Sequence, residues 1–122
     1  METARNGVIL FTQEYERALA FYRDVMGLQV ERQKPGLTLF DFGGAYLMVE
    51  EGGKASVHEK TREQNPTVLR WNVRDFDRAV EELRSRGAAV TVRAFHWGTI
   101  GVLTDPEGNR LELLKHEEPA QG

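Results

Sequence analysis

Few residues of this sequence combine a reactive side chain with an apolar setting. Arg70 lies in the run 67–73 and Glu112 in the run 110–115, both otherwise rich in apolar residues. Glu112 could act as a general base or hydrogen-bond acceptor, and Arg70 could bind an anionic or carbonyl group of a ligand. Alternatively, the two charges neutralise each other, because an unpaired buried charge is costly. Mutual neutralisation is the preferred interpretation, and the functional one stays open.

The histidines offer a second kind of chemistry. His96 precedes Trp97 in a connection between two expected strands, where it could close over a ligand or transfer a proton. It could equally be an exposed loop residue. Trp97 could provide a stacking surface or a dimer contact. His58 lies in a polar segment and His116 follows the last expected strand, so neither is expected to take part.

The composition excludes several classes of function. The chain has 122 residues, a net charge of −3 and 40% hydrophobic residues, as is typical of a globular protein. It has no cysteine, which excludes disulfides, thiolate metal sites and a cysteine nucleophile. There is no basic run for nucleic acid, no apolar stretch of membrane-spanning length and no glycine-rich phosphate loop. Residues 1–6 are polar, so no secretory signal is expected and a cytoplasmic location is the default.

The elements that must position these side chains repeat at an offset of 61 residues. Apolar residues recur at i, i+3, i+4 and i+7, the pattern of one helix face. The stripe of the first half is Tyr15, Ala18, Leu19 and Tyr22, and that of the second half is Phe76, Ala79, Val80 and Leu83. An apolar run precedes each stripe and a glycine follows it. Two copies of one strand–helix–strands unit are therefore expected, with both stripes in the core.

Each unit is expected to have the order βαβββ, so the fold class is α+β. The expected strands are 8–11, 28–31, 37–42, 45–50, 67–73, 88–94, 99–104 and 110–115. One helix is expected from the N-cap Thr12 to about Met26, and another from the N-cap Asp75 to about Arg86. A single domain over 1–122 would then contain a module at about 6–50, a polar linker at 51–66 and a module at about 67–116.

Two stretches resemble the signatures of a known family. Residues 18–28 (ALAFYRDVMGL) are close to "FYrdvLGl", and residues 105–113 (DPEGNRLEL) are close to "DPdGNxxEl". With the internal repeat, they resemble the vicinal oxygen chelate superfamily, which includes glyoxalase I, bleomycin-resistance proteins, extradiol dioxygenases and fosfomycin-resistance transferases. The resemblance covers nearly the whole chain. It implies two modules, each a curled sheet with one helix, that together form a cup.

In enzymes of this superfamily a divalent metal binds in the cup, held by His, Gln or Glu at up to four places. The resemblance puts these places at Gly7, Met48, Val68 and Glu112. Only Glu112 can donate to such a metal. A register slip would add Glu50, which shares a strand face with Met48, but would add no histidine. No metal and no other cofactor is therefore expected.

The same alignment predicts the lining of the cup, because alternate strand residues point to one face. The expected lining is largely apolar, with Arg70 and Glu112 as its charged pair. Tyr46 could form an aromatic wall or could simply pack. The candidate ligand-binding residues are Phe11, Tyr46, Met48, Val68, Arg70, His96, Trp97, Val102 and Glu112, and Glu112 is also the candidate catalytic residue.

The expected function is metal-free binding of a small, partly apolar molecule in the cup, as bleomycin-resistance-like proteins bind their ligand. Their ligand is cationic and their cleft acidic. The positive charge of Arg70 makes that particular ligand doubtful here. One alternative is a metal-dependent glyoxalase-type lyase or dioxygenase, and another is acid–base catalysis by Glu112 with His96 or Arg70. A scaffold with a vestigial cup is a third class. The resemblance also implies a homodimer, and no nucleic-acid or membrane partner is expected.

Overall fold

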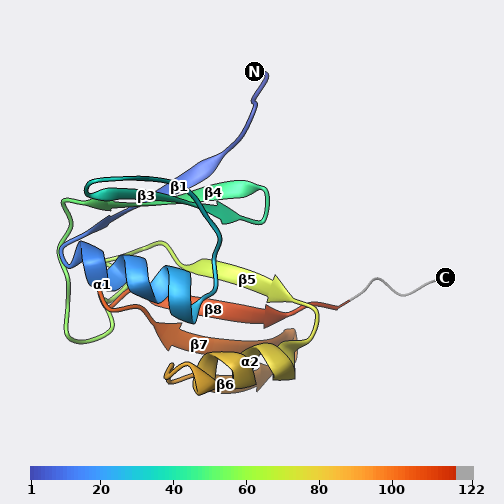
Figure 1. Cartoon of the computed structure of the whole chain (residues 1–122). Coiled ribbons are helices and arrows are strands. Elements are labelled where there is room, and N and C mark those ends of the chain that lie inside the picture. The colour runs from blue at the N-terminus through green and yellow to red at the C-terminus, as the bar shows by residue number, and fades with distance from the viewer. Residues whose placement is uncertain (118–122) are drawn as a thin grey trace. The chain divides into compact units, whose positions relative to one another are not determined.

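Two four-stranded sheets, each with one helical segment, account for the described part of the chain, residues 1–117 of a computed structural model (Figure 1). One unit comprises Met1–His58 with Pro106–Gly108, and the other comprises Glu59–Asp105 with the chain from Asn109 onward. Both units have the order βαβββ. The expected α+β class and the tandem repeat are confirmed.

The sheet of the first unit has the strand order β1-β4-β3-β2. Its elements are β1 (Gly7–Thr12), α1 (Tyr15–Ala20), the π-helical turn η1 (Phe21–Val25), β2 (Val30–Lys34), β3 (Leu37–Phe42) and β4 (Ala45–Glu51). Strands β1 and β4 are parallel, and the other neighbours are antiparallel. The helix ends at Gly27, whose φ of 71° is a left-handed value that glycine adopts without strain.

The sheet of the second unit repeats this plan in the order β5-β8-β7-β6. Its elements are β5 (Leu69–Val73), α2 (Phe76–Ser85), β6 (Thr91–Phe95), β7 (Gly98–Thr104) and β8 (Arg110–Lys115). Strands β5 and β8 are parallel, and the other neighbours are antiparallel. As expected, the side chain of Asp75 caps α2 by accepting a hydrogen bond from the backbone N–H of Arg78 (3.3 Å).

The helix stripes form the core of each unit. Seven of the eight stripe residues are buried, and Ala79 is half-buried. On β4 the buried Leu47 and Val49 alternate with half-buried residues, whereas on β8 Leu111, Glu112 and Leu113 are all buried. One face of each sheet therefore packs in the core, and the other face carries the alternate residues of the same strands.

The sequence predicted Thr12 as the N-cap of α1, but the N-cap residue is Glu14, and its side chain makes no capping hydrogen bond. The Thr12 hydroxyl donates to the backbone carbonyl of Glu50 (3.0 Å) instead. The fully buried carboxylate of Glu107 accepts hydrogen bonds from the backbone N–H groups of Gln13 (2.7 Å) and Glu14 (2.9 Å). Glu107 thus holds the two residues that immediately precede α1 and gives their backbone N–H groups a partner.

Three strands begin two or three residues later than expected, because pairing partners decide where a strand begins. Strand β2 starts at Val30 and runs to Lys34, opposite Leu37, so that it includes polar residues next to the hairpin turn. Strand β5 starts at Leu69, because its partner β8 starts at Arg110. Strand β6 starts only at Thr91, since residues 88–90 follow the end of α2. Within residues 1–117, no helix has the length and apolar character needed to cross a membrane.

Candidate functional site

Three charged side chains lie on one face of the sheet in the second unit. Glu112 on β8 pairs in register with Arg70 on β5 and with Val102 on β7. Paired residues on neighbouring strands share a face, so Arg70 and Glu112 lie side by side with Val102 next to them. Arg110 precedes Glu112 by two residues on β8 and therefore lies on the same face.

The carboxylate of Glu112 accepts hydrogen bonds at both of its oxygens. Arg70 donates to Oε1 from Nε (3.1 Å) and from Nη2 (2.8 Å). Arg110 donates to Oε2 from Nε (3.0 Å). The Glu112 side chain is 8% exposed, whereas the Arg70 side chain is 43% exposed. Two guanidinium groups thus hold one buried carboxylate, and Arg70 is the more exposed of the two arginine side chains.

The pKa of Glu112 results from two opposing effects. Burial acts to raise the pKa, because desolvation disfavours the charged carboxylate. The hydrogen bonds and the positive charges of Arg70 and Arg110 act to lower it, and together they prevail. Glu112 is therefore a carboxylate at neutral pH, with both oxygens engaged, and a carboxylate with a lowered pKa is a poor proton acceptor.

The corresponding face of the first unit carries large apolar side chains beside charged ones such as Glu50, which pairs with Phe11. Ile9 on β1 pairs with Met48 on β4, which is the place that Arg70 and Glu112 take in the second unit. Ile9 and Phe11 are 48% and 52% exposed, so this face presents large apolar side chains to solvent. The strand register that the sequence predicted, with Met48 as the counterpart of Glu112, is the observed one.

Tyr46 fills the space beside Gly7. The two residues pair in register, and a Cβ atom on Gly7 would collide with the Tyr46 ring. The guanidinium carbon of Arg5 lies 5.7 Å from the ring centroid, within the range of a cation–π contact. Arg5 is itself held by Glu31 and by two backbone carbonyl groups. The position of Tyr46 is therefore supported from both sides.

The residues present do not fit the divalent metal that the family resemblance implies. Gly7 has no side chain, Val68 has no donor atom, and Met48 offers only a thioether. Glu112 uses both oxygens to accept hydrogen bonds from arginines. Across residues 1–117, His, Asp and Glu side chains form no group of three or more that could hold a metal ion.

The remaining predicted site residues are placed as follows. Val68 is half-buried and immediately precedes β5. His96 and Trp97 are exposed in the turn that joins β6 to β7. The Trp97 ring stacks on that of Phe95, with centroids 5.1 Å apart and 2° between the planes. In the second unit the structure thus brings Arg70, Glu112 and Val102 together, and it puts His96 and Trp97 at a hairpin tip.

Sequence reasoning missed Arg110 as a member of the charged cluster. The signal was present, because a strand period of two puts residues 110 and 112 on one face. Nothing in the sequence indicated that the Tyr46 ring covers Gly7. It depends on which way one aromatic ring turns.

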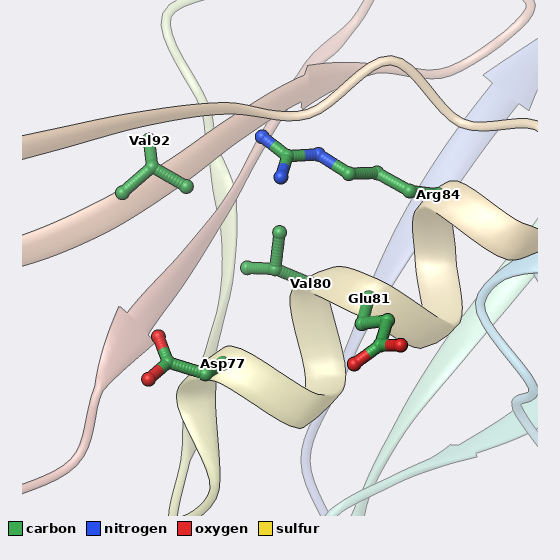
Figure 2. Close-up of a pocket in the computed structure, with 5 residues that line it drawn as sticks. All are labelled: Asp77, Val80, Glu81, Arg84 and Val92. Carbon is green, nitrogen blue, oxygen red and sulfur yellow. The ribbon is translucent and has the colours of Figure 1, made fainter.

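A surface pocket lies on the other side of the second sheet. Figure 2 shows its lining, which consists of Asp77, Val80, Glu81 and Arg84 from α2 and Val92 from β6. Its volume is about 370 Å³. Val92 pairs with Gly101, and a Cβ on Gly101 would point at Phe76 of α2, so this is the helix side of the sheet. The guanidinium of Arg84 donates to the backbone carbonyl of Val90 (2.7 Å). The residues that line the pocket include none of the predicted site residues.

Several solved structures share this fold. A lactoylglutathione lyase from Agrobacterium tumefaciens is 19% identical, with a TM-score of 0.71 over 94% of this chain and 95% of that one. The fosfomycin resistance protein FosX from Listeria monocytogenes, solved with Mn(II) and 1S,2S-dihydroxypropylphosphonic acid, is 15% identical, with a TM-score of 0.73 over 96% and 93%. TioX from Micromonospora sp. ML1 is 20% identical, with a TM-score of 0.75 over 94% and 100%. At these identities the likeness shows the fold.

The family itself is shown by comparing the sequence with known proteins and protein families. Among curated proteins none matches this chain. The model of one protein family matches residues 5–113, a range that includes both signature stretches and all of the strands but the last two residues of β8. The chain therefore belongs to the Glyoxalase/Bleomycin resistance protein/Dioxygenase superfamily.

Proposed function

We propose that this protein binds a small, partly apolar molecule without using a metal. The state of Glu112 is the observation that carries this proposal. It is the one residue with a suitable donor among the four expected ligand positions, and both its oxygens accept hydrogen bonds from Arg70 and Arg110. A metal would have to displace two charge-assisted hydrogen-bond partners from a buried carboxylate, and would then find no second strong ligand at Gly7, Met48 or Val68.

The apolar part of the ligand is inferred from the exposed side chains of the first unit. Ile9 and Phe11 lie two residues apart on β1 and share a face, and both are about half exposed. Large apolar side chains that stay in contact with solvent on one face are typical of binding surfaces. Met48, which pairs with Ile9, extends this face onto β4.

An enzymatic function by acid–base catalysis fits the site less well. General bases work best when their pKa lies near the working pH, which for a carboxyl group requires a raised value. Glu112 has the opposite shift, because its two arginine partners outweigh burial. We therefore assign Glu112 the role of orienting Arg70 and Arg110.

The proposal also includes the homodimer that the family resemblance implies, and a cytoplasmic location, which suits a chain without cysteine. Analytical ultracentrifugation of the purified chain gives the oligomeric state directly. A sedimentation mass of twice that of one chain is expected, and the mass of a single chain would contradict this part of the proposal.

A ligand screen in the presence and absence of a chelator tests the function. The full chain is treated with EDTA, and its Tm is measured with a library of anionic, neutral and cationic molecules of up to about 20 heavy atoms. Binding to the native state alone raises Tm. We expect at least one partly apolar compound to raise Tm equally in both samples. If every effect disappears with EDTA and returns with added metal, binding depends on a metal and the proposal fails.

A further inference from the structure

We propose that the ligand carries a carboxylate, and that this group binds the outward edge of the Arg70 guanidinium. This inference rests on the proposed function, because it specifies the chemistry of the molecule that the sheet face of the second unit accepts. Its basis is the difference in exposure and hydrogen bonding between Arg70 and Arg110. The side chains around them on this face add further support.

The hydrogen bonds of Arg70 leave one edge of its guanidinium open. A guanidinium presents N–H donors along two edges, Nε with Nη2 and Nη1 with Nη2. Arg70 directs Nε and Nη2 at a single oxygen, Oε1 of Glu112. Within residues 1–117, its Nη1 has no hydrogen-bond partner. The open edge has the spacing that a second carboxylate requires for two parallel N–H···O bonds.

The charges on this face leave Arg70 with an excess of positive charge. Arg110 is the more buried partner of Glu112, at 23% exposure, and its Nε donates to Oε2 (3.0 Å). Glu59, which is 43% exposed, lies 3.9 Å from Nη1 of Arg110 and so compensates part of that charge only weakly, through solvent. One guanidinium would suffice to neutralise the carboxylate of Glu112. Arg70 adds a second charge, held in place by the hydrogen bonds that it donates.

The described strand residues of this face include no other carboxylate. Strand alternation and register also place residues of β6 and β7 there, among them Thr91, Arg93, Ile100 and Val102. Arg93 is exposed and adds to the positive potential. An anion is therefore attracted to this face, and the nearest group that can bind it through two hydrogen bonds is Arg70.

Apolar side chains adjoin Arg70 in one direction along the sheet. Val102 stands next to Glu112, and the following row of the face contains Ile100 and Leu114, which pair with each other. Val102 and Leu114 are half-buried, whereas Ile100 is only 3% exposed. A molecule whose carboxylate binds Arg70 would lay an apolar portion over Val102 and Leu114. The ligand class is thus a monocarboxylate with an aliphatic or aromatic body.

Titration of the purified chain with octanoate, followed by two-dimensional NMR of the arginine Nε–H groups and by isothermal titration calorimetry, tests this inference. 1-Octanol, which has the same chain without the charge, and inorganic phosphate, which has the charge without the chain, are the comparison probes. The variants are Arg70→Gln and Arg70→Lys. Arg93→Gln is the matched control, because it removes an exposed arginine from the same face without touching Glu112.

Octanoate is expected to shift the Arg70 Nε–H resonance in the wild-type protein, which requires no substitution that could impair folding. Arg70→Gln is expected to weaken octanoate binding by roughly 10- to 100-fold, the range for a charge-assisted hydrogen-bond pair. The octanoate affinity of Arg70→Lys should lie between those of Arg70→Gln and the wild type, because lysine keeps the charge but not the planar guanidinium. Arg93→Gln should change the affinity less than about threefold, since it is a screened surface charge.

Several results would overturn the inference. If octanol binds as tightly as octanoate and Arg70→Gln changes neither, the protein binds apolar molecules but the carboxylate assignment is wrong, while the proposed function stands. If phosphate binds more tightly than octanoate, the ligand is a phosphate and not a carboxylate. If neither octanoate nor octanol binds while the broader screen yields cationic ligands, the charge assignment is wrong. If no compound of any charge binds, the proposed function itself fails.

Discussion

The ring of Tyr46 lies over Gly7, in the space that any other side chain at residue 7 would occupy. In the family resemblance, residue 7 is one of the four places for a metal ligand. Tyr46 thus closes that place in this chain. A glycine and the tyrosine across from it form one structural unit, because the ring has room only where the side chain of residue 7 is missing.

The first prediction concerns this pair. Gly7→Ala is expected to destabilise the protein by about 1 kcal/mol, because the added methyl group must displace the Tyr46 ring from its position under Arg5. The backbone of Gly7 is not left-handed, so the cost is steric and not conformational. In a Tyr46→Ser background the same substitution should cost much less. Urea denaturation of the four proteins measures the coupling, and equal costs in both backgrounds would show that the ring does not restrict residue 7.

The second prediction concerns Glu107, which holds the two residues before α1. Glu107→Ala removes a buried carboxylate that accepts two backbone hydrogen bonds, and is expected to lower the free energy of unfolding by about 2 kcal/mol or more. Asp75→Ala, which removes the exposed cap of α2, is the matched control and should cost about 1 kcal/mol. Chemical denaturation gives both values. A smaller loss of stability for Glu107→Ala than for Asp75→Ala would mean that the hydrogen bonds of the buried carboxylate contribute little.

The third prediction follows from the lowered pKa of Glu112. Because the folded-state pKa lies below the unfolded value of about 4.3, the interactions of the carboxylate stabilise the folded state above that value. This contribution is lost as the pH falls through the lower, folded-state pKa. Wild type should therefore exceed Glu112→Gln in stability at pH 7, and the difference should shrink when the pH is lowered below about 4. A difference that grows on acidification would show that the pKa of Glu112 is raised instead.

The fourth prediction separates the two arginines. Arg110 is less exposed than Arg70, so Arg110→Gln is expected to cost more stability than Arg70→Gln, by about 1 kcal/mol. Arg70→Gln should in turn have the larger effect on octanoate affinity. Thermal unfolding and calorimetric titration of both variants measure the two effects. If Arg70→Gln is the more destabilising change and leaves affinity intact, Arg70 is a structural residue alone.

Much of the fold could be predicted from the sequence, because it depends on local patterns and on an internal repeat. The stripes at Tyr15 and Phe76 identified both helices, and the alternation of Leu111 and Leu113 with Glu112 identified β8 and its faces. The start of β5 could not be predicted, since it depends on the length of its partner β8. The hydrogen bonds of Glu107 before α1 could not be predicted either, because Glu107 is more than 90 residues from Gln13 in the chain.

The candidate site was only partly predictable for a similar reason. The pairing of Arg70 with Glu112 followed from strand register, which residue spacing can supply. The engagement of both Glu112 oxygens depends on the geometry of Arg110. Whether a side chain has room at residue 7 depends on the rotamer of Tyr46. Side-chain rotamers are set by three-dimensional neighbours and leave no periodic pattern in a sequence.

Elemental analysis tests the central claim, that this member of the superfamily works without a metal, most directly. The full chain, free of any histidine tag, is incubated with Mn, Fe, Ni and Zn salts, desalted and analysed by inductively coupled plasma mass spectrometry, with Glu112→Gln prepared in parallel. The account predicts far less than one metal per chain in both proteins. Near-stoichiometric metal in the wild type that is lost in Glu112→Gln would contradict it, and would identify Glu112 as a metal ligand.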